Sequence, residues 1–137
     1  MKEEAAILSL LREVCPTLQA VYLFGSFGQG DPRPGSDVDL ALLLPPEEAK
    51  AAGRLYLTDL HRELLGLMGR EVDLINLRQV STVLQKEVIG YGRRIFCSDA
   101  YATDEFEMLV LSAYQKLNEE RAGVLQEGQR SGRFYDL

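Results

Sequence analysis

The chain has 137 residues, of which 46% are hydrophobic and 26% are charged. That composition is typical of a soluble globular domain, and no apolar run reaches the roughly 20 residues that a membrane-spanning helix needs. The 21 acidic residues outnumber the 15 basic ones, which disfavours general attraction to nucleic acid. We therefore expect one domain over residues 1–137 with no membrane partner. Its acidic start, unlike a secretory signal, predicts a cytoplasmic protein.

The first half of the chain predicts two helices around a pair of strands. Apolar residues recur near a 3.6-residue period in residues 2–14, which predicts a helix. The apolar runs at 20–24 and 38–44 predict buried strands. The segment between them is rich in glycine and proline, and it is too short for an ordinary parallel crossover helix, so a mixed sheet is expected. A leucine-rich stripe then predicts one helix across 47–68.

The second half of the chain continues the alternation of strands and helices. Its predicted elements are a strand at 71–77, a helix capped by Ser81 and ending near Tyr91, a short strand at 93–97, a long helix at about 103–127 with Glu107 in a capping box, and a flexible tail at 128–137. Together the elements predict an α/β (α+β) fold with a mixed β-sheet flanked by helices.

The long final helix carries an apolar stripe. Its members are Phe106, Leu109, Val110, Ala113, Leu117 and Val124. Such a stripe most often packs on its own domain, but a terminal helix with this much apolar surface also suits docking of a helical partner. Both interpretations stay open at the level of sequence.

Asp37 and Asp39 lie at the start of the predicted second strand, which is otherwise apolar. Two like charges at this place do not stabilise the strand, so they call for another explanation. Because side chains alternate along a strand, both carboxylates emerge on one face, about 6–7 Å apart along the backbone. Asp73 lies near the start of the third strand and joins them if the two strands are neighbours. Three such oxygen ligands suit two Mg²⁺ ions, or Mn²⁺, in a site for nucleotidyl transfer.

Gly25 and Ser26 follow the first strand and complete this interpretation. Gly25 lets the backbone approach a phosphate closely, while Ser26 offers an N–H and a hydroxyl at the start of a turn. Ser26 also fits a helix cap, and the two roles are compatible. The pattern therefore predicts a triphosphate held between backbone donors and metal ions.

Simpler explanations exist for each of these residues taken alone. The SDVD segment fits a polar turn that leads into a strand, and Asp73 alone fits a solvent-facing position. The Gly-Ser pair together with both acidic segments favours the metal site. His61, the single histidine of the sequence, fits a packing or surface position and receives no catalytic role.

The stretch GSFGQGDPRPGSDVDL, followed later by VDLINL, resembles the signature of the nucleotidyltransferase superfamily with a polymerase β type of catalytic core. In that signature GS is followed by ten residues and then by DxD. The chain length and the surrounding helices resemble the minimal nucleotidyltransferases, the MNT antitoxins encoded beside HEPN-domain toxins.

This resemblance implies a minimal nucleotidyltransferase fold and a Mg²⁺-dependent enzyme that moves AMP from ATP onto a tyrosine of the HEPN RNase toxin and so silences it. Carried over by position, Gly25 and Ser26 would bind the triphosphate, and Asp37 and Asp39 would bind the two metal ions. Asp73 would give a third metal contact and act as the base.

Two other functions stay open. Many relatives carry a basic segment after the Gly-Ser pair, where this chain has Phe27, Gly28 and Gln29, although Arg33 could supply positive charge. That difference favours a binding module that neutralises the toxin by covering it. A small-molecule nucleotidyltransferase shares the motif but normally has a second domain for its acceptor, for which 137 residues leave little room.

Overall fold

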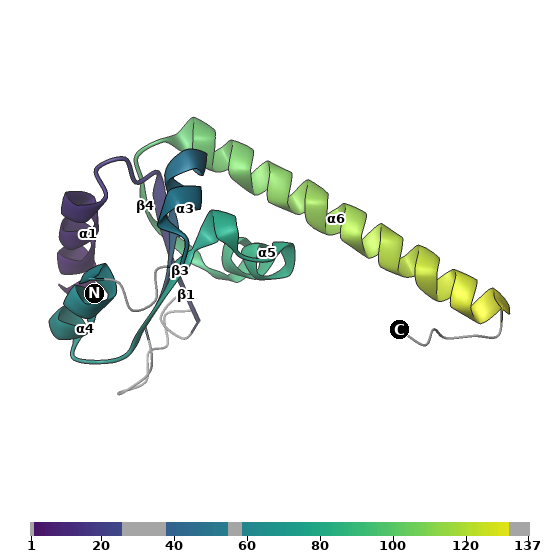
Figure 1. The fold of residues 1–137 in the computed structure, drawn as a ribbon, viewed down its shortest axis with the longest axis horizontal. Coiled ribbons are helices and arrows are strands. Elements are labelled where there is room, and N and C mark those ends of the chain that lie inside the picture. The colour runs from purple at the N-terminus through teal and green to yellow at the C-terminus, as the bar shows by residue number, and fades with distance from the viewer. Residues whose placement is uncertain (1, 26–37, 55–58, 132–137) are drawn as a thin grey trace.

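A computed structural model describes residues 2–25, 38–54 and 59–131 of the chain. Figure 1 shows a central sheet with helices on both sides and one long helix that extends away from it. In chain order the elements are α1 (Lys2–Val14), β1 (Ala20–Phe24), β2 (Val38–Leu43), α3 (Pro46–Ala52), α4 (Asp59–Met68), β3 (Val72–Asn76), a short 3-10 helix (Leu77–Gln79), α5 (Thr82–Tyr91), β4 (Arg93–Cys97) and α6 (Ala100–Ser131).

The sheet has the strand order β3-β2-β1-β4. β1 pairs in antiparallel fashion with both β2 and β4, whereas β2 and β3 are parallel. The mixed α/β sheet expected from the sequence is therefore confirmed. Because β2 and β3 are parallel, their first residues lie side by side. The prediction that Asp73 lies close to the acids of the second strand depends on this pairing.

The core lies on both faces of the sheet because side chains alternate along each strand. On one face, strand residues such as Leu23, Leu40 and Leu74 pack against α1 and α4. On the other face, Tyr22 and Leu43 pack with residues of α5 and α6. Figure 1 shows α1 and α4 together on one side of the sheet, with α5 on the other.

The single helix expected across 47–68 is wrong, because the structure has two helices there, α3 and α4. α3 ends before Gly53, which has a φ of +60°, a left-handed conformation that favours glycine and stops a helix. The side-chain amide of Asn76 fixes this end by donating hydrogen bonds of 2.8 Å to the carbonyl oxygens of Ala49 and Gly53. The residue that binds the last carbonyl oxygens of α3 thus comes from β3. Local sequence patterns cannot predict this contact.

The long helix starts earlier than predicted, at Ala100 instead of about residue 103. The carboxylate of Asp99 accepts a 3.0 Å hydrogen bond from the backbone N–H of Ala102 and so caps the helix. Thr103 lies inside the helix and is buried. The predicted capping box is therefore wrong, and Glu107 has another partner, described below.

The end of α6 also differs from the prediction, because helix continues to Ser131 through the first part of the tail expected at 128–137. Residues 132–137 lie outside the described part of the chain. None of the described helices combines the length and the apolar character needed to cross a bilayer.

Only the first part of α6 packs on the domain. Phe106 and Val110 are buried, but no side chain described between Leu111 and Val124 is. Figure 1 shows this part of α6 projecting away from the sheet and the other helices. Packing on its own domain is thus confirmed for Phe106 and Val110, whereas it is wrong for Leu109, which is 63% exposed. Docking of a partner by the rest of the stripe stays a prediction.

Arg94 of β4 fixes the base of α6. Its guanidinium forms ion pairs with Asp104, at 3.2 Å, and with Glu107. We expect Arg94→Gln to lower the free energy of unfolding by about 1 kcal/mol, because a partly buried pair with two carboxylates lies at the upper end of the range for surface ion pairs. Urea denaturation measures this change.

A control for that measurement comes from Arg62, which pairs with Asp59 at 3.4 Å on α4. The two side chains are 71% and 95% exposed, so Arg62→Gln should leave the unfolding midpoint unchanged within error. Equal losses of stability for the two variants would show that Arg94 does not fix α6.

Candidate functional site

The strand register places Phe24, Asp39 and Asp73 in one row across three strands. Phe24 of β1 pairs with Asp39 of β2, and Asp39 pairs with Asp73 of β3. Neighbouring strands lie about 4.8 Å apart, and directly paired residues point to the same face of a sheet. The two carboxylates therefore emerge side by side on the face that also carries α5 and α6.

The surroundings of the two acids suit binding of a cation. Asp39 is partly buried and Asp73 is exposed, whereas Val38 and Leu40 point into the core on the other face. Like charges directly opposite one another on neighbouring strands destabilise a sheet. Hard carboxylate oxygens in such a pair match the preferences of Mg²⁺ or Mn²⁺.

Two of the predicted site residues, Ser26 and Asp37, lie outside the described residues, so their places stay predictions. Within residues 2–25, 38–54 and 59–131 no group of three or more histidine, cysteine or acidic side chains could hold a metal ion. The described part of the chain thus supplies the pair Asp39 and Asp73, to which the sequence adds Asp37.

Gly25 lies directly against Asp39. It follows β1 with a φ of +71°, and a Cβ added to it would overlap Oδ2 of Asp39 and lie 3.2 Å from Cγ. The sequence assigned Gly25 to close approach of a phosphate. The structure adds a second reason for glycine, because only a residue without a side chain leaves room for the Asp39 carboxylate at this position.

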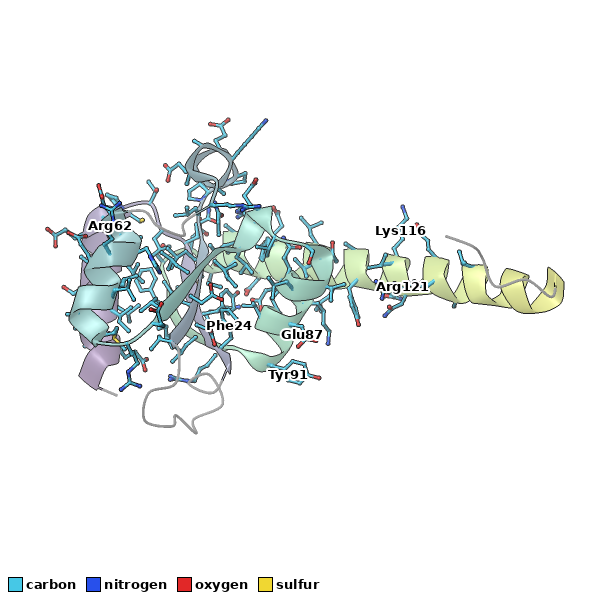
Figure 2. All side chains as sticks on the ribbon, turned by 60° about the horizontal axis from the view of Figure 1, so that its bottom comes forward. Phe24, Arg62, Glu87, Tyr91, Lys116 and Arg121 are labelled. Atoms are coloured by element: carbon cyan, nitrogen blue, oxygen red, sulfur yellow. The ribbon has the colours of Figure 1, made fainter. Side chains whose placement is uncertain are left out.

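An open pocket of about 530 Å³ adjoins Gly25. Phe24 and Gly25 form its side at the sheet, and Leu84, Glu87 and Tyr91 of α5 form the other. Figure 2 shows Phe24, Glu87 and Tyr91 near one another at this end of the sheet. The sequence analysis missed this pocket, although positions 84, 87 and 91 have the spacing of one helix face.

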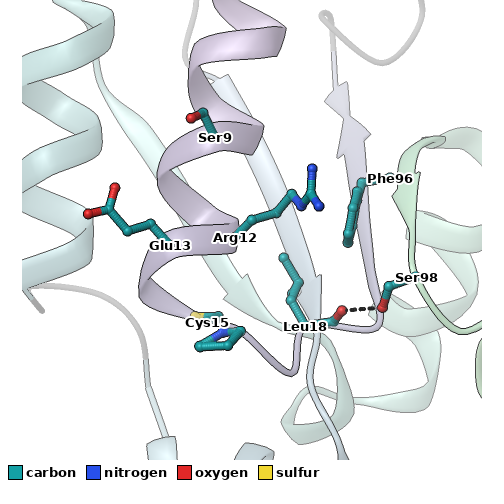
Figure 3. A pocket seen from close by; sticks show the side chains of 8 residues that line it. Ser9, Arg12, Glu13, Cys15, Leu18, Phe96 and Ser98 are labelled. Carbon is teal, nitrogen blue, oxygen red and sulfur yellow. Dashed lines mark hydrogen bonds between the residues drawn. The ribbon is translucent and has the colours of Figure 1, made fainter.

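A second pocket, of about 430 Å³, lies between α1 and β4 on the opposite face of the sheet. Figure 3 shows Arg12 reaching across it to Phe96, with the guanidinium carbon 5.4 Å from the centre of the ring. The Ser98 hydroxyl donates to the carbonyl oxygen of Leu18 at its edge. Because the sheet separates this pocket from Asp39, it is not part of the candidate site.

His61 of α4 has a structural position, as expected. It is buried, and its Nε2 lies 2.8 Å from the carbonyl oxygen of Val72. That contact ties α4 to the start of β3, one residue before Asp73. The histidine thus helps to hold the strand that presents an acid, and it lies on the face away from the carboxylates.

Comparison with known proteins agrees with this geometry. Residues 6–101 match the family described as polymerase beta, nucleotidyltransferase. The chain is 34% identical over 125 residues to the protein adenylyltransferase MntA of Shewanella oneidensis, across 90% of this chain and 86% of that protein.

Solved structures show the same likeness over nearly the whole chain. A toxin–antitoxin crystal structure with AMP-PNP aligns with a TM-score of 0.73 and 32% identity, over 92% of this chain and 98% of that chain. A tri-AMPylated Shewanella oneidensis HEPN toxin in complex with its MNT antitoxin gives a TM-score of 0.67 and 31% identity, over 93% and 96% of the two chains. The chain therefore belongs to the polymerase β-type nucleotidyltransferase family and has the minimal nucleotidyltransferase fold.

Proposed function

We propose that this chain is a Mg²⁺-dependent protein adenylyltransferase that transfers AMP from ATP to a tyrosine of a HEPN-domain RNase toxin, and that it acts in the cytoplasm as the antitoxin. The observation that carries the proposal is the row formed by Phe24, Asp39 and Asp73, with Gly25 against the Asp39 carboxylate. The relatives support the substrate and the partner, since one is named a protein adenylyltransferase and others are complexes with AMP-PNP or with an AMPylated HEPN toxin.

The proposed reaction assigns each site residue a role. The tyrosine oxygen attacks the α-phosphorus of ATP, an O–P bond forms, and the bond to pyrophosphate breaks. Asp37 and Asp39 would hold Mg²⁺, with Asp73 as a third contact and as the base that accepts the proton of the tyrosine hydroxyl, and the backbone at Gly25 and Ser26 would donate to the triphosphate. When bound, Mg²⁺ neutralises charge on the phosphates and eases deprotonation of the attacking hydroxyl.

Transfer of label from ATP tests this function directly. The purified chain, its cognate HEPN toxin and Mg²⁺ are incubated with ATP labelled at either the α- or the γ-phosphate. Label from the α-phosphate alone should reach the toxin, because pyrophosphate leaves. Chelation of Mg²⁺ should abolish the transfer, and Mn²⁺ should restore it. Labelling from the γ-phosphate, or labelling that survives chelation, would overturn the proposal.

A second candidate function, neutralisation by binding alone, rests on α6. Leu111 and Val124 are 48% and 49% exposed on a helix that projects from the domain, as a surface for a protein partner would be. Calorimetry separates the two functions. A pure binding module holds the toxin but shows no Mg²⁺-dependent affinity for ATP, whereas the proposed enzyme binds both.

A further inference from the structure

We propose that an extended segment of the protein acceptor binds as an added strand along the outer edge of β3, which places the acceptor tyrosine beside Asp73. This inference rests on the proposed function, because it concerns the protein that receives AMP. It goes beyond that function by giving the acceptor a backbone conformation and a binding surface. That surface is the edge of the sheet at β3 together with the pocket that adjoins it.

The position of the triphosphate decides from which side the acceptor enters. Gly25 lies at one end of the row that runs through Asp39 to Asp73, and the proposed function places the phosphates at Gly25. In phosphoryl transfer the attacking and leaving oxygens lie roughly in line. Because pyrophosphate would leave on the Gly25 side, the attacking hydroxyl must approach from the Asp73 side, where β3 is the last strand of the sheet.

The outer edge of β3 carries the backbone N–H and C=O of Leu74. In a parallel pair, successive residues of a strand direct their backbone groups alternately toward the partner strand and away from it. The N–H of Val38 donates to the carbonyl oxygen of Glu71 at 2.9 Å, and Val38 is paired with Val72. The backbone groups of Val72 and Leu74 therefore point away from β2.

The domain covers this edge on both sides of Leu74. The carbonyl oxygen of Val72 lies 2.8 Å from Nε2 of His61 on α4, and the side chain of Asn76 holds the end of α3 at the other end of the strand. Within residues 2–25, 38–54 and 59–131, neither backbone group of Leu74 has a partner on the outer side of the sheet. Unpaired groups on a strand edge are a template for an added strand.

A strand added at this edge continues the row of the candidate site. Directly paired residues of neighbouring strands point to the same face of a sheet, with the strands about 4.8 Å apart. The residue of the added strand that pairs with Asp73 would thus lie next to the Asp73 carboxylate, on the face that also carries Asp39. A tyrosine at this position has its side chain on the same face as the proposed base.

A pocket of about 500 Å³ adjoins the same edge and would receive a second side chain of the segment. Its wall contains Leu74, Ile75 and, from α5, Leu84. Ile75 shares a face with Asp73, because the two are two residues apart on one strand. A residue two positions from the tyrosine would therefore lie opposite Ile75. Backbone hydrogen bonds to Leu74 supply affinity, and the pocket selects an apolar residue at that position.

An ester bond in place of the amide before Leu74 tests the edge. Incorporation of the α-hydroxy analogue of leucine at position 74 replaces the N–H by oxygen and leaves every side chain in place. Half-maximal transfer of α-labelled AMP to the full-length cognate toxin should then need about fivefold more toxin, which is the effect of losing one ordinary hydrogen bond. The Mg²⁺-dependent affinity for AMP-PNP should stay unchanged, because the edge does not contact the nucleotide.

The same ester before Leu42 is the matched control. Leu42 has the same side chain and lies in β2, where its N–H points toward β3 inside the sheet, as that of Val38 does. This variant should lose stability but need no more toxin than the native chain. Equal shifts in the two variants would show that a weakened sheet, and not the outer edge, causes the effect, and the inference would fail.

Methylated peptides give a second measurement, which uses the native chain. Mass spectrometry of the labelled toxin locates the acceptor tyrosine, and synthetic peptides of that segment serve as substrates. In an added strand of either direction, alternate N–H groups point toward β3. Methylation of the tyrosine nitrogen and of the preceding nitrogen should therefore differ, with one reducing labelling about tenfold and the other leaving it unchanged. Equal effects at the two positions would overturn the inference.

The outcomes separate this inference from the proposed function. If the Leu74 ester needs no more toxin than the native chain, the acceptor binds elsewhere, and the inference fails while transfer to the toxin stands. If the chain alone forms a dimer that this ester dissociates, the edge belongs to a second copy, and the inference fails as well. If the native chain transfers no AMP to the toxin, both proposals fail.

Discussion

Asp39→Asn is expected to reduce AMP transfer to the toxin by about 10³-fold or more while the chain stays folded. The reason is that the amide keeps the size of the side chain but removes the charge that holds the cation against the phosphates. Loss of such an electrostatic contact costs several kcal/mol in the transition state, and each 1.4 kcal/mol is a factor of ten in rate. Single-turnover transfer of α-labelled AMP measures the loss, and circular dichroism checks the fold.

Three further variants make this result interpretable. Asp59→Asn changes an exposed acid on α4 that pairs only with the exposed Arg62 among the described residues, and it should transfer AMP at the native rate. Asp73→Asn should lose activity to a similar extent as Asp39→Asn, and the double variant should be little worse, since residues that act as a unit are not additive. Native activity in Asp39→Asn would remove the metal site from the proposed function.

Gly25→Ala is the second variant with a large expected effect, and it should lower AMP transfer at least 10²-fold. The added methyl group would occupy the position of Asp39 Oδ2, so the carboxylate must move or β1 must separate from β2. A misplacement of about 1 Å at a reacting centre is enough for a loss of this size. The same rate assay measures it, together with Mg²⁺-dependent binding of AMP-PNP by calorimetry.

Gly69→Ala separates the steric effect from the backbone effect. Gly69 also has a positive φ, +66°, but a Cβ there would meet nothing within 4 Å. Both variants should therefore lose about 1 kcal/mol of stability from the left-handed backbone, whereas only Gly25→Ala should lose activity. Equal loss of activity in the two would show that general destabilisation, and not the position of Asp39, causes the defect.

Local patterns were enough to predict the strands and most helices. The runs at 20–24, 38–44 and 71–77 differ from β1, β2 and β3 by at most one residue at either end, because each is rich in apolar residues and the first two end at Gly25 and Pro45. Ser81 caps α5 as predicted, accepting a hydrogen bond from the N–H of Leu84 at 3.2 Å. The sequence analysis failed at the end of α3, where the distant Asn76 binds the last carbonyl oxygens, and at the start of α6, where it overlooked the local cap Asp99.

For the candidate site, the structure bears on the positions of Gly25, Asp39 and Asp73, whereas Ser26 and Asp37 lie outside the described residues and stay predictions. The spacing of Gly25, Asp39 and Asp73 indicated a site, and the register confirms that the two acids are paired. The pocket wall from α5 was not predicted, because the position of α5 relative to the end of β1 depends on how the helix crosses the sheet. The Phe106 to Val124 stripe was ambiguous for the same reason, since periodicity shows that one side of a helix is apolar but not what lies opposite it.

The attachment of α6 has a mechanical consequence. The helix has 32 residues and is about 48 Å long, and the contacts with the domain that the structure describes lie in its first half, where Arg94 pairs with Asp104 and Glu107 and the Lys86 ammonium lies over the ring of Tyr114. Residues 115–131 span about 25 Å, so a rotation of about 10° at Tyr114 would move the end of the helix by roughly 4 Å. A partner that binds Leu117 and Val124 would act first on β4 and α5, which lie against the first half of α6; β4 is the edge strand at the opposite end of the sheet from β3, which carries Asp73.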